Sequence, residues 1–134
     1  MDFTIHTNEG EYDLSAHVRL IGDDLLVAIW GGEKPHIGAV AAAQSSPSLK
    51  DPKVMSTTAS VLCYSGHKED ELAKSAAKKL AAAFDTNVVV TAGIHWDNLS
   101  AEGIQKVNRN SDVLVMSISN KIQAELGKEP RICQ

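Results

Sequence analysis

The sequence predicts an α+β fold with one mixed, mostly antiparallel sheet of about six strands and two or three helices on one face. Apolar and polar residues alternate through much of the first half of the chain, which is the period of strands. Helical spacing of apolar residues appears at 67–84 and again from 101 onward. Because the strands come first and helices then alternate with one more strand, the helices should share one face.

Five strands are expected in the first part of the chain. They cover residues 2–8, 12–20, 25–30, 37–43 and 54–64. The first two form a hairpin across Glu9 and Gly10. The third is apolar at nearly every position, which indicates a central place in the sheet. Serines and prolines gather at 44–53 and predict a loop there.

The segment 67–84 is the strongest helix signal, with acidic residues in its first turn and lysines nearer its end, as the helix dipole favours. A β-branched run at 87–92 predicts the sixth strand. Ser100 is expected to cap a second helix that ends at Gly127, with a break or kink near Ser111 because residues 108–110 are poor helix formers. We assign residues 1–127 to one domain and residues 128–134 to a C-terminal tail.

The composition bounds the function. The chain has 134 residues and a formal net charge of -4, so no electrostatic footprint for nucleic acid is expected. No window of 18 apolar residues is present for a membrane span, and the N-terminus has neither a basic start nor a long apolar stretch. We expect a cytoplasmic protein that binds neither nucleic acid nor a membrane.

Strand polarity brings three loops to one edge of the expected sheet. The fifth strand, the helix after it and the sixth strand form a βαβ unit, so both strands should end at the same edge. The fourth strand is joined to the fifth without a helix and should run antiparallel to it, which places its start at that edge. His36, His67 and His95 lie in these loops. We call residues 31–38, 65–68 and 93–97 the three-loop edge.

The helix start at Gly66, His67 and Lys68 suits a phosphate, because free amides and the positive end of a dipole point toward an anion there. The alternative is a helix start dictated by strand geometry alone. Three carboxylates, at residues 69–71, follow directly and would repel an anion. The phosphate interpretation therefore requires that they face away from the site.

A metal is the second possibility at the three-loop edge. Imidazole and carboxylate groups bind divalent ions, and the candidate ligands are His36, His67, His95 and Asp97. Their spacing matches no recognised metal motif, and single histidines in loops more often make hydrogen bonds. Nucleophilic catalysis by Ser65 with His67 lacks a supporting motif. No catalytic residue is assigned.

Four ordered motifs resemble the LpdD-like prenylated flavin chaperone family, whose members are small accessory proteins of UbiD-type phenolic-acid decarboxylase systems. They are GDDLL at 22–26, GGEKPHIGAV at 31–40, GHKED at 66–70 and AGIHWD at 92–97. The resemblance spans about residues 2–126. It implies a homodimeric, non-catalytic carrier that binds prenylated FMN, or FMN, and delivers it to a UbiD-type apo-decarboxylase.

The resemblance also implies which residues hold the flavin. They are Lys34, Pro35, His36, Gly66, His67, Lys68, His95 and Asp97. The predicted flavin set also includes Ser65 and Trp96 and leaves Asp97 to the predicted metal set. The phosphate would lie at 66–68, and His36, His95 and Trp96 would be nearer the ring. Two other hypotheses remain: a metal-dependent enzyme that acts on a small anionic substrate through the His/Asp set, and an interaction protein without a small ligand.

Overall fold

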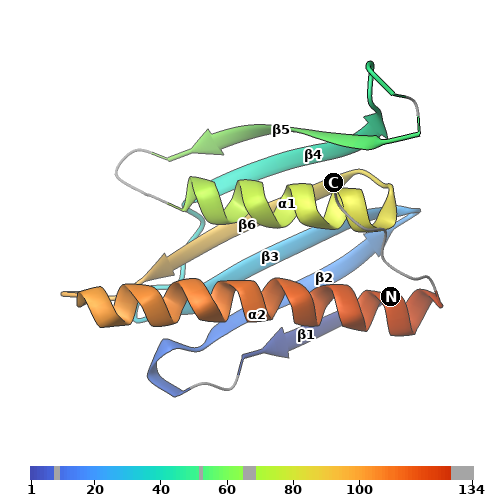
Figure 1. Ribbon diagram of the computed structural model, residues 1–134. Helices are drawn as coiled ribbons and strands as arrows, with labels where there is room; N and C mark the ends of the chain where they lie inside the picture. The colour runs from blue at the N-terminus through green and yellow to red at the C-terminus, as the bar shows by residue number, and fades with distance from the viewer. Residues whose placement is uncertain (8–9, 52, 65–68, 128–134) are drawn as a thin grey trace.

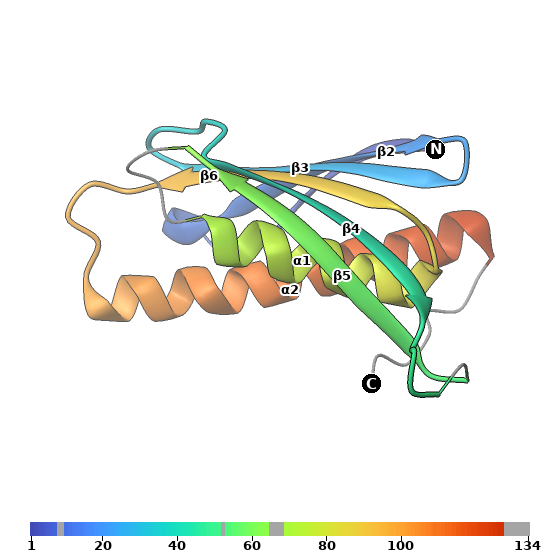
Figure 2. The ribbon, with the colours of Figure 1, turned by 90° about the horizontal axis from the view of Figure 1, so that it is seen from above.

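The computed structural model describes residues 1–7, 10–51, 53–64 and 69–127. It contains one sheet with two α-helices against one face (Figures 1 and 2). The strands are β1 (Asp2–His6), β2 (Leu14–Ile21), β3 (Asp24–Gly32), β4 (Ala39–Pro47), β5 (Met55–Cys63) and β6 (Val88–His95). The helices are the short 3-10 helix η1 (Gly10–Tyr12), α1 (Asp70–Phe84) and α2 (Ala101–Leu126).

The six strands lie in the order β1-β2-β3-β6-β4-β5. The pair β3–β6 is parallel, and the other four neighbouring pairs are antiparallel. The predicted α+β class and the mixed, mostly antiparallel sheet are confirmed. The strand β3 is central, as its unbroken apolar run indicated.

The core lies between the sheet and the helices. Alternate residues are buried over 14–18 of β2, 25–31 of β3, 39–43 of β4 and 88–92 of β6, which is the pattern of strands covered on one face. Helix α1 covers β4, β5 and β6, and α2 covers the β1–β2 side (Figure 1). Alanines line the contact of α1 with β4, among them Ala39, Ala41, Ala76 and Ala77. Such small side chains let the helix axis approach the sheet closely.

Two sequence expectations about these elements are wrong. Residues 44–47 continue β4 and pair with residues 55–58 of β5, so the loop is shorter than predicted. The main chain of the serines there pairs with the neighbouring strand, and local propensity cannot predict this tertiary contact. Helix α2 runs from Ala101 to Leu126 without interruption. Its poor helix former Asn110 is buried and donates from Nδ2 to the carbonyl oxygen of Tyr12 at 2.7 Å.

The predicted ends of α2 are confirmed. The Ser100 hydroxyl accepts a hydrogen bond from the Gly103 amide, and Gly127 adopts a left-handed conformation with φ of 67°. Neither of the α-helices that the structure describes is long and apolar enough to cross a membrane. Within the described residues, α1 begins at Asp70 with Glu69 as its N-cap. The predicted helix start at 67–68 lies outside the described residues, as do residues 65, 66 and 128–134.

Candidate functional site

The loop at residues 33–38 crosses the end of β6, because β6 lies between β3 and β4 while this loop joins β3 to β4. Backbone hydrogen bonds fix it at both ends. The Glu33 amide donates to the His95 carbonyl at 2.7 Å, and the Gly38 amide donates to the Ala92 carbonyl at 2.9 Å. The Tyr64 amide then donates to the Gly38 carbonyl at 2.8 Å. The ends of β3, β5 and β6 and the start of β4 thus meet at one edge, as strand polarity predicted.

Two glycines make the crossing possible. A Cβ atom on Gly93 would lie 1.6 Å from the carbonyl oxygen of His36, and one on Gly32 would lie 2.1 Å from that of His95. Gly32 also has a φ of +87°, which other residues adopt only with strain. No side chain can be accommodated at Gly93 unless the loop moves. The glycines at this edge therefore serve backbone-to-backbone approach within the protein.

A buried histidine–carboxylate pair lies under the loop. His36 Nε2 is 2.9 Å from Glu69 Oε1, with the two side chains only 23% and 8% exposed. His36 Nδ1 lies 2.7 Å from the Lys34 carbonyl oxygen, so it donates to a group that only accepts. Glu69 Oε1 also accepts from the Ile94 amide at 3.4 Å. The pair joins the loop, the end of β6 and the start of α1.

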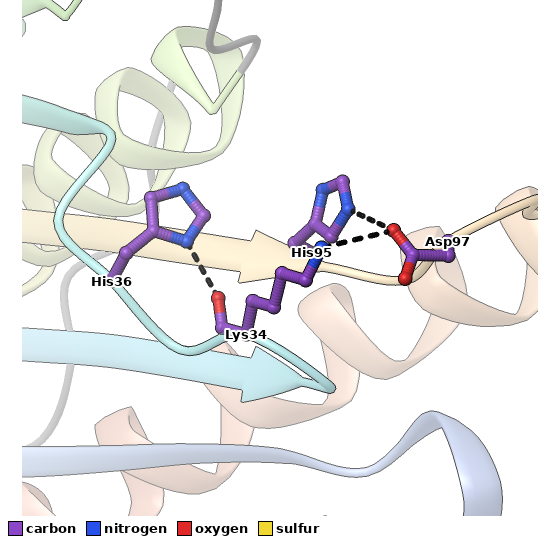
Figure 3. A network of polar contacts seen from close by, with 4 residues as sticks. All are labelled: Lys34, His36, His95 and Asp97. Carbon is purple, nitrogen blue, oxygen red and sulfur yellow. Dashed lines mark hydrogen bonds and ion pairs between the residues drawn. The ribbon is translucent and has the colours of Figure 1, made fainter.

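An exposed cluster lies beside this pair on the same edge (Figure 3). His95 Nε2 is 2.9 Å from Asp97 Oδ1, and Lys34 Nζ is 3.4 Å from the same oxygen. The three side chains are 44%, 50% and 67% exposed in the order His95, Asp97 and Lys34. The hydrogen bond from His95, with the hydrogen bond and positive charge of Lys34, holds the pKa of Asp97 below its ordinary value.

Trp96 points away from the loop at 33–38 and anchors its own segment. Its indole Nε1 donates to the Glu11 carbonyl at 3.1 Å, and its ring meets that of Tyr12 with centroids 5.6 Å apart. A hollow of about 490 Å³ adjoins this contact. It is lined by Glu11, Tyr12, Lys106, Arg109, Asn110 and Val113. The sequence analysis missed this hollow, because its lysine and arginine lie on α2 among other exposed polar residues.

The structure brings together part of the predicted flavin set. Lys34, His36 and His95 lie on one edge (Figure 3), and Pro35 follows Lys34 in the exposed part of the loop. Ser65, Gly66, His67 and Lys68 lie outside the described residues. The phosphate interpretation required the carboxylates at 69–71 to face away from the site, yet Glu69 is buried against His36. Glu71 is exposed.

The predicted metal ligands form two separate contacts in the structure. His36 faces Glu69, while His95 faces Asp97. Among the residues that the structure describes, no group of three or more His, Cys, Asp or Glu side chains is arranged to hold a metal ion. His67, the remaining member of the predicted set, lies outside them. Both nitrogens of the His36 ring face protein oxygens, so this side chain would have to leave a partner before it could bind a metal.

Comparison with known proteins identifies the family. The model of the prenylated flavin chaperone LpdD-like domain matches residues 8–123. The chain belongs to the LpdD-like prenylated flavin chaperone family. Protein LpdD of Lactiplantibacillus plantarum is 28% identical to it over 121 residues, which cover 90% of this chain and 85% of that protein. The resemblance seen in the four sequence motifs is thereby confirmed.

A solved structure also resembles the chain. It is a chain in the crystal structure of a chaperone complex for yeast 20S proteasome assembly, with a TM-score of 0.49 and 12% sequence identity. The match covers 87% of this chain and 95% of that chain.

Membership of the LpdD-like family assigns the protein a chaperone role for prenylated flavin. It is a flavin chaperone rather than a catalyst, as the sequence predicted. Nothing in the described residues favours the alternative of a metal-dependent enzyme. The flavin is therefore cargo, and the chemistry that the site must provide is binding and release.

Proposed function

We propose that this protein binds prenylated FMN at the three-loop edge and hands it to a UbiD-type apo-decarboxylase. The observation that carries the location is the loop at 33–38, which hydrogen bonds fix across the end of β6 beside an exposed cation and an exposed imidazole. In sheets with parallel strands, ligands bind beyond the carboxyl ends of those strands. The ends of β3 and β6, the parallel pair, lie at this edge.

The residues present fit a flavin nucleotide. Lys34 Nζ is two-thirds exposed, lies 3.4 Å from the carboxylate of Asp97, and carries a charge that can meet a phosphate. His95 offers a ring nitrogen and a flat face to the polar edge of an isoalloxazine. The proposal assigns flavin contacts to Lys34, Pro35, His36, Ser65, Gly66, His67, Lys68 and His95. Trp96 holds the segment at 95–97 in place through Glu11 and Tyr12.

The charge balance supports an anion at the start of α1. Glu69 lies against His36, so its carboxylate faces an imidazole that can compensate its negative charge. Glu71 is exposed. The carboxylate of Glu69 makes no capping hydrogen bond to α1, although it occupies the N-cap. The amides of the first turn are thus left to other acceptors, and a flavin phosphate is the acceptor that we propose.

Fluorescence titration with prenylated FMN and with plain FMN tests the binding. We expect saturable binding that weakens about tenfold when Lys34→Ala and His95→Ala are combined, as expected for one or two charge-assisted hydrogen bonds. Arg109→Ala is the matched control, because it removes a cation from the hollow behind Trp96. Binding lost in Arg109→Ala and retained in the double variant would move the site to the hollow. No binding of either flavin at high micromolar concentration would refute the proposal.

The delivery step has its own test. Flavin-loaded protein should restore decarboxylase activity to a UbiD-type apo-enzyme faster than the same concentration of free prenylated FMN does. Equal rates would mean that the protein stores the flavin and does not deliver it.

The proposal also includes a homodimer in the cytoplasm, as the family resemblance and the sequence led us to expect. Light scattering across a range of protein concentrations and cell fractionation measure these two properties directly.

A further inference from the structure

We propose that Glu69 is a positioning residue of the flavin site. It holds His36 as an imidazolium and thereby fixes the loop at 33–38 across the end of β6. The inference rests on the proposed flavin site and names a residue outside the predicted binding set. Three contacts carry it: His36 with Glu69, His36 with Lys34, and Glu69 with Ile94.

The direction of the Glu69 side chain is not explained by the helix. Glu69 is the N-cap of α1, and an acidic residue at such a position commonly accepts hydrogen bonds from the first-turn amides. Its carboxylate makes no such bond and instead turns to the sheet edge, where its side chain is 8% exposed. Burial of a carboxylate is costly unless a partner of opposite charge compensates it. Among the described residues, His36 is the side chain that lies against this carboxylate and can compensate its charge.

The described contacts of His36 bear on the charge of its ring. Nδ1 lies 2.7 Å from the Lys34 carbonyl oxygen, which only accepts, so Nδ1 carries a proton. A neutral ring would then direct the lone pair of Nε2 at Glu69 Oε1, which lies 2.9 Å away. Two acceptors at that distance repel each other. A second proton on Nε2 removes the repulsion and forms an ion pair, so the described contacts favour an imidazolium.

The pair transmits its position to the ligand-facing residues. Lys34 is tied through its carbonyl oxygen to the His36 ring, and Pro35 lies between the two in the chain. Gly38, at the other end of the loop, approaches the same carboxylate so closely that a Cβ atom there would lie 2.4 Å from Glu69 Oε2. Glu69 thus lies against the loop both at His36 and at Gly38. Loss of the carboxylate should release Lys34 and Pro35 from their common geometry.

The experiment compares three variants of the full chain. Glu69→Ala removes the partner of His36, Glu69→Gln keeps the shape but removes the charge, and Glu71→Ala is a control in the same turn whose side chain is exposed. For prenylated FMN we expect about tenfold weaker binding by Glu69→Ala and less than about threefold weaker binding by Glu69→Gln, because the amide nitrogen of the glutamine can donate to Nε2 of a neutral His36 ring. Glu71→Ala should bind like the wild type.

Two further measurements separate positioning from general loss of structure. Nitrogen-15 NMR of the histidine rings in flavin-free protein should show both His36 nitrogens protonated at neutral pH, and a neutral ring in Glu69→Gln. In a double-mutant cycle, Glu69→Ala should lose most of its effect on binding once His36→Ala is present, because Glu69 acts through His36. If Glu69→Ala does not fold, the Glu69→Gln spectrum and affinity still decide the question.

The outcomes are distinguishable from failure of the flavin site itself. A wild type that binds no flavin refutes the proposed function, and the NMR result then decides the His36–Glu69 pair alone. Wild-type affinity in Glu69→Ala, additive effects in the cycle, or a neutral His36 ring in the wild type would each overturn the positioning role. Tenfold weakening by Glu71→Ala would do the same, because the effect would then follow any charge lost from the first turn of α1.

Discussion

Two histidine–carboxylate pairs lie on the same edge of the sheet and differ mainly in burial. The nitrogen–oxygen distance is 2.9 Å in His36–Glu69 and also in His95–Asp97. The first pair is mostly buried, whereas about half of each side chain in the second is exposed. Exposed ion pairs contribute little to stability, because water competes for both charges. The same contact under the loop is harder to break, since a buried charge would lose a compensating partner.

The difference in burial gives the two pairs different roles, which suit a carrier. The buried pair and the backbone hydrogen bonds of the loop define where Lys34 and Pro35 lie. His95, Asp97 and Lys34 can give up their contacts with one another and contact a ligand instead, with little loss of stability. A carrier must bind its cargo and also release it, so a rigid backbone with weakly held side chains is an appropriate arrangement.

The largest effect is expected from Gly93→Ala, which tests whether the loop must cross β6 where it does. The new Cβ atom would lie 1.6 Å from the His36 carbonyl oxygen, and no rotamer change relieves a clash with backbone. The loop would have to lift, which would disturb the buried pair and the bond from Gly38 to Ala92. We expect a loss of about 3 kcal/mol in the free energy of unfolding, measured with urea.

Gly22→Ala is the matched control for Gly93→Ala. Gly22 has a φ of +60° but nothing within 4 Å of the added atom, so only its left-handed conformation is penalised, by about 1 kcal/mol. Equal losses in the two variants would mean that the loop yields easily. The result would show that the His36–Glu69 pair does not hold the loop in a fixed position.

A smaller difference should separate the two histidines. His36→Ala leaves Glu69 buried without its imidazole and should lower the free energy of unfolding by about 2 kcal/mol. His95→Ala removes an exposed partner of Asp97 and should change it by less than about 0.5 kcal/mol. Urea unfolding of both variants measures the two losses, provided that the slope of the free energy of unfolding against urea concentration is unchanged. A larger loss in His95→Ala would reverse the roles of the two pairs.

The contrast between the pairs also shows what the sequence could predict. Strand polarity was enough to bring residues 31–38 and 93–97 to one edge, because it depends only on connection lengths and on the βαβ unit. The same reasoning could not find Glu69. A carboxylate in the first turn of a helix is favourable for the dipole in any fold, so its pattern is the same whether the side chain faces water or a histidine.

Tertiary contacts also explain other differences between the sequence expectations and the structure. Asn110 is a poor helix former, yet it lies within an unbroken helix because its amide finds the Tyr12 carbonyl, far away in the sequence. Trp96 follows His95 directly and was expected near the flavin ring, but its indole nitrogen binds the Glu11 carbonyl of η1. Sequence position indicates which loop a side chain belongs to. It does not indicate the direction in which the side chain leaves that loop.

The smallest effect concerns Asp97 and disappears in acid. The pKa of Asp97 is lower in the folded protein than its ordinary value, first through His95 and then through Lys34. The ionised form is thus favoured by folding, and its contribution is complete at neutral pH. It should be lost as the pH falls from about 4, the usual pKa of a free aspartate, through the lower folded value. Asp97→Asn should therefore melt slightly below the wild type at pH 7.

The melting temperatures of wild type and Asp97→Asn, recorded from pH 7 to pH 2.5, should converge at the acid end. Lys34→Ala provides the control, because it removes one of the two causes of the lowered pKa. When Lys34→Ala is already present, adding Asp97→Asn should lower the melting temperature at pH 7 by a smaller amount that is still measurable. A difference in melting temperature that is the same at every pH would show that Asp97 acts through its shape or hydrogen bonds alone. The exposed cluster would then contribute no charge-dependent stability, and the contrast with the buried pair at His36 would become sharper.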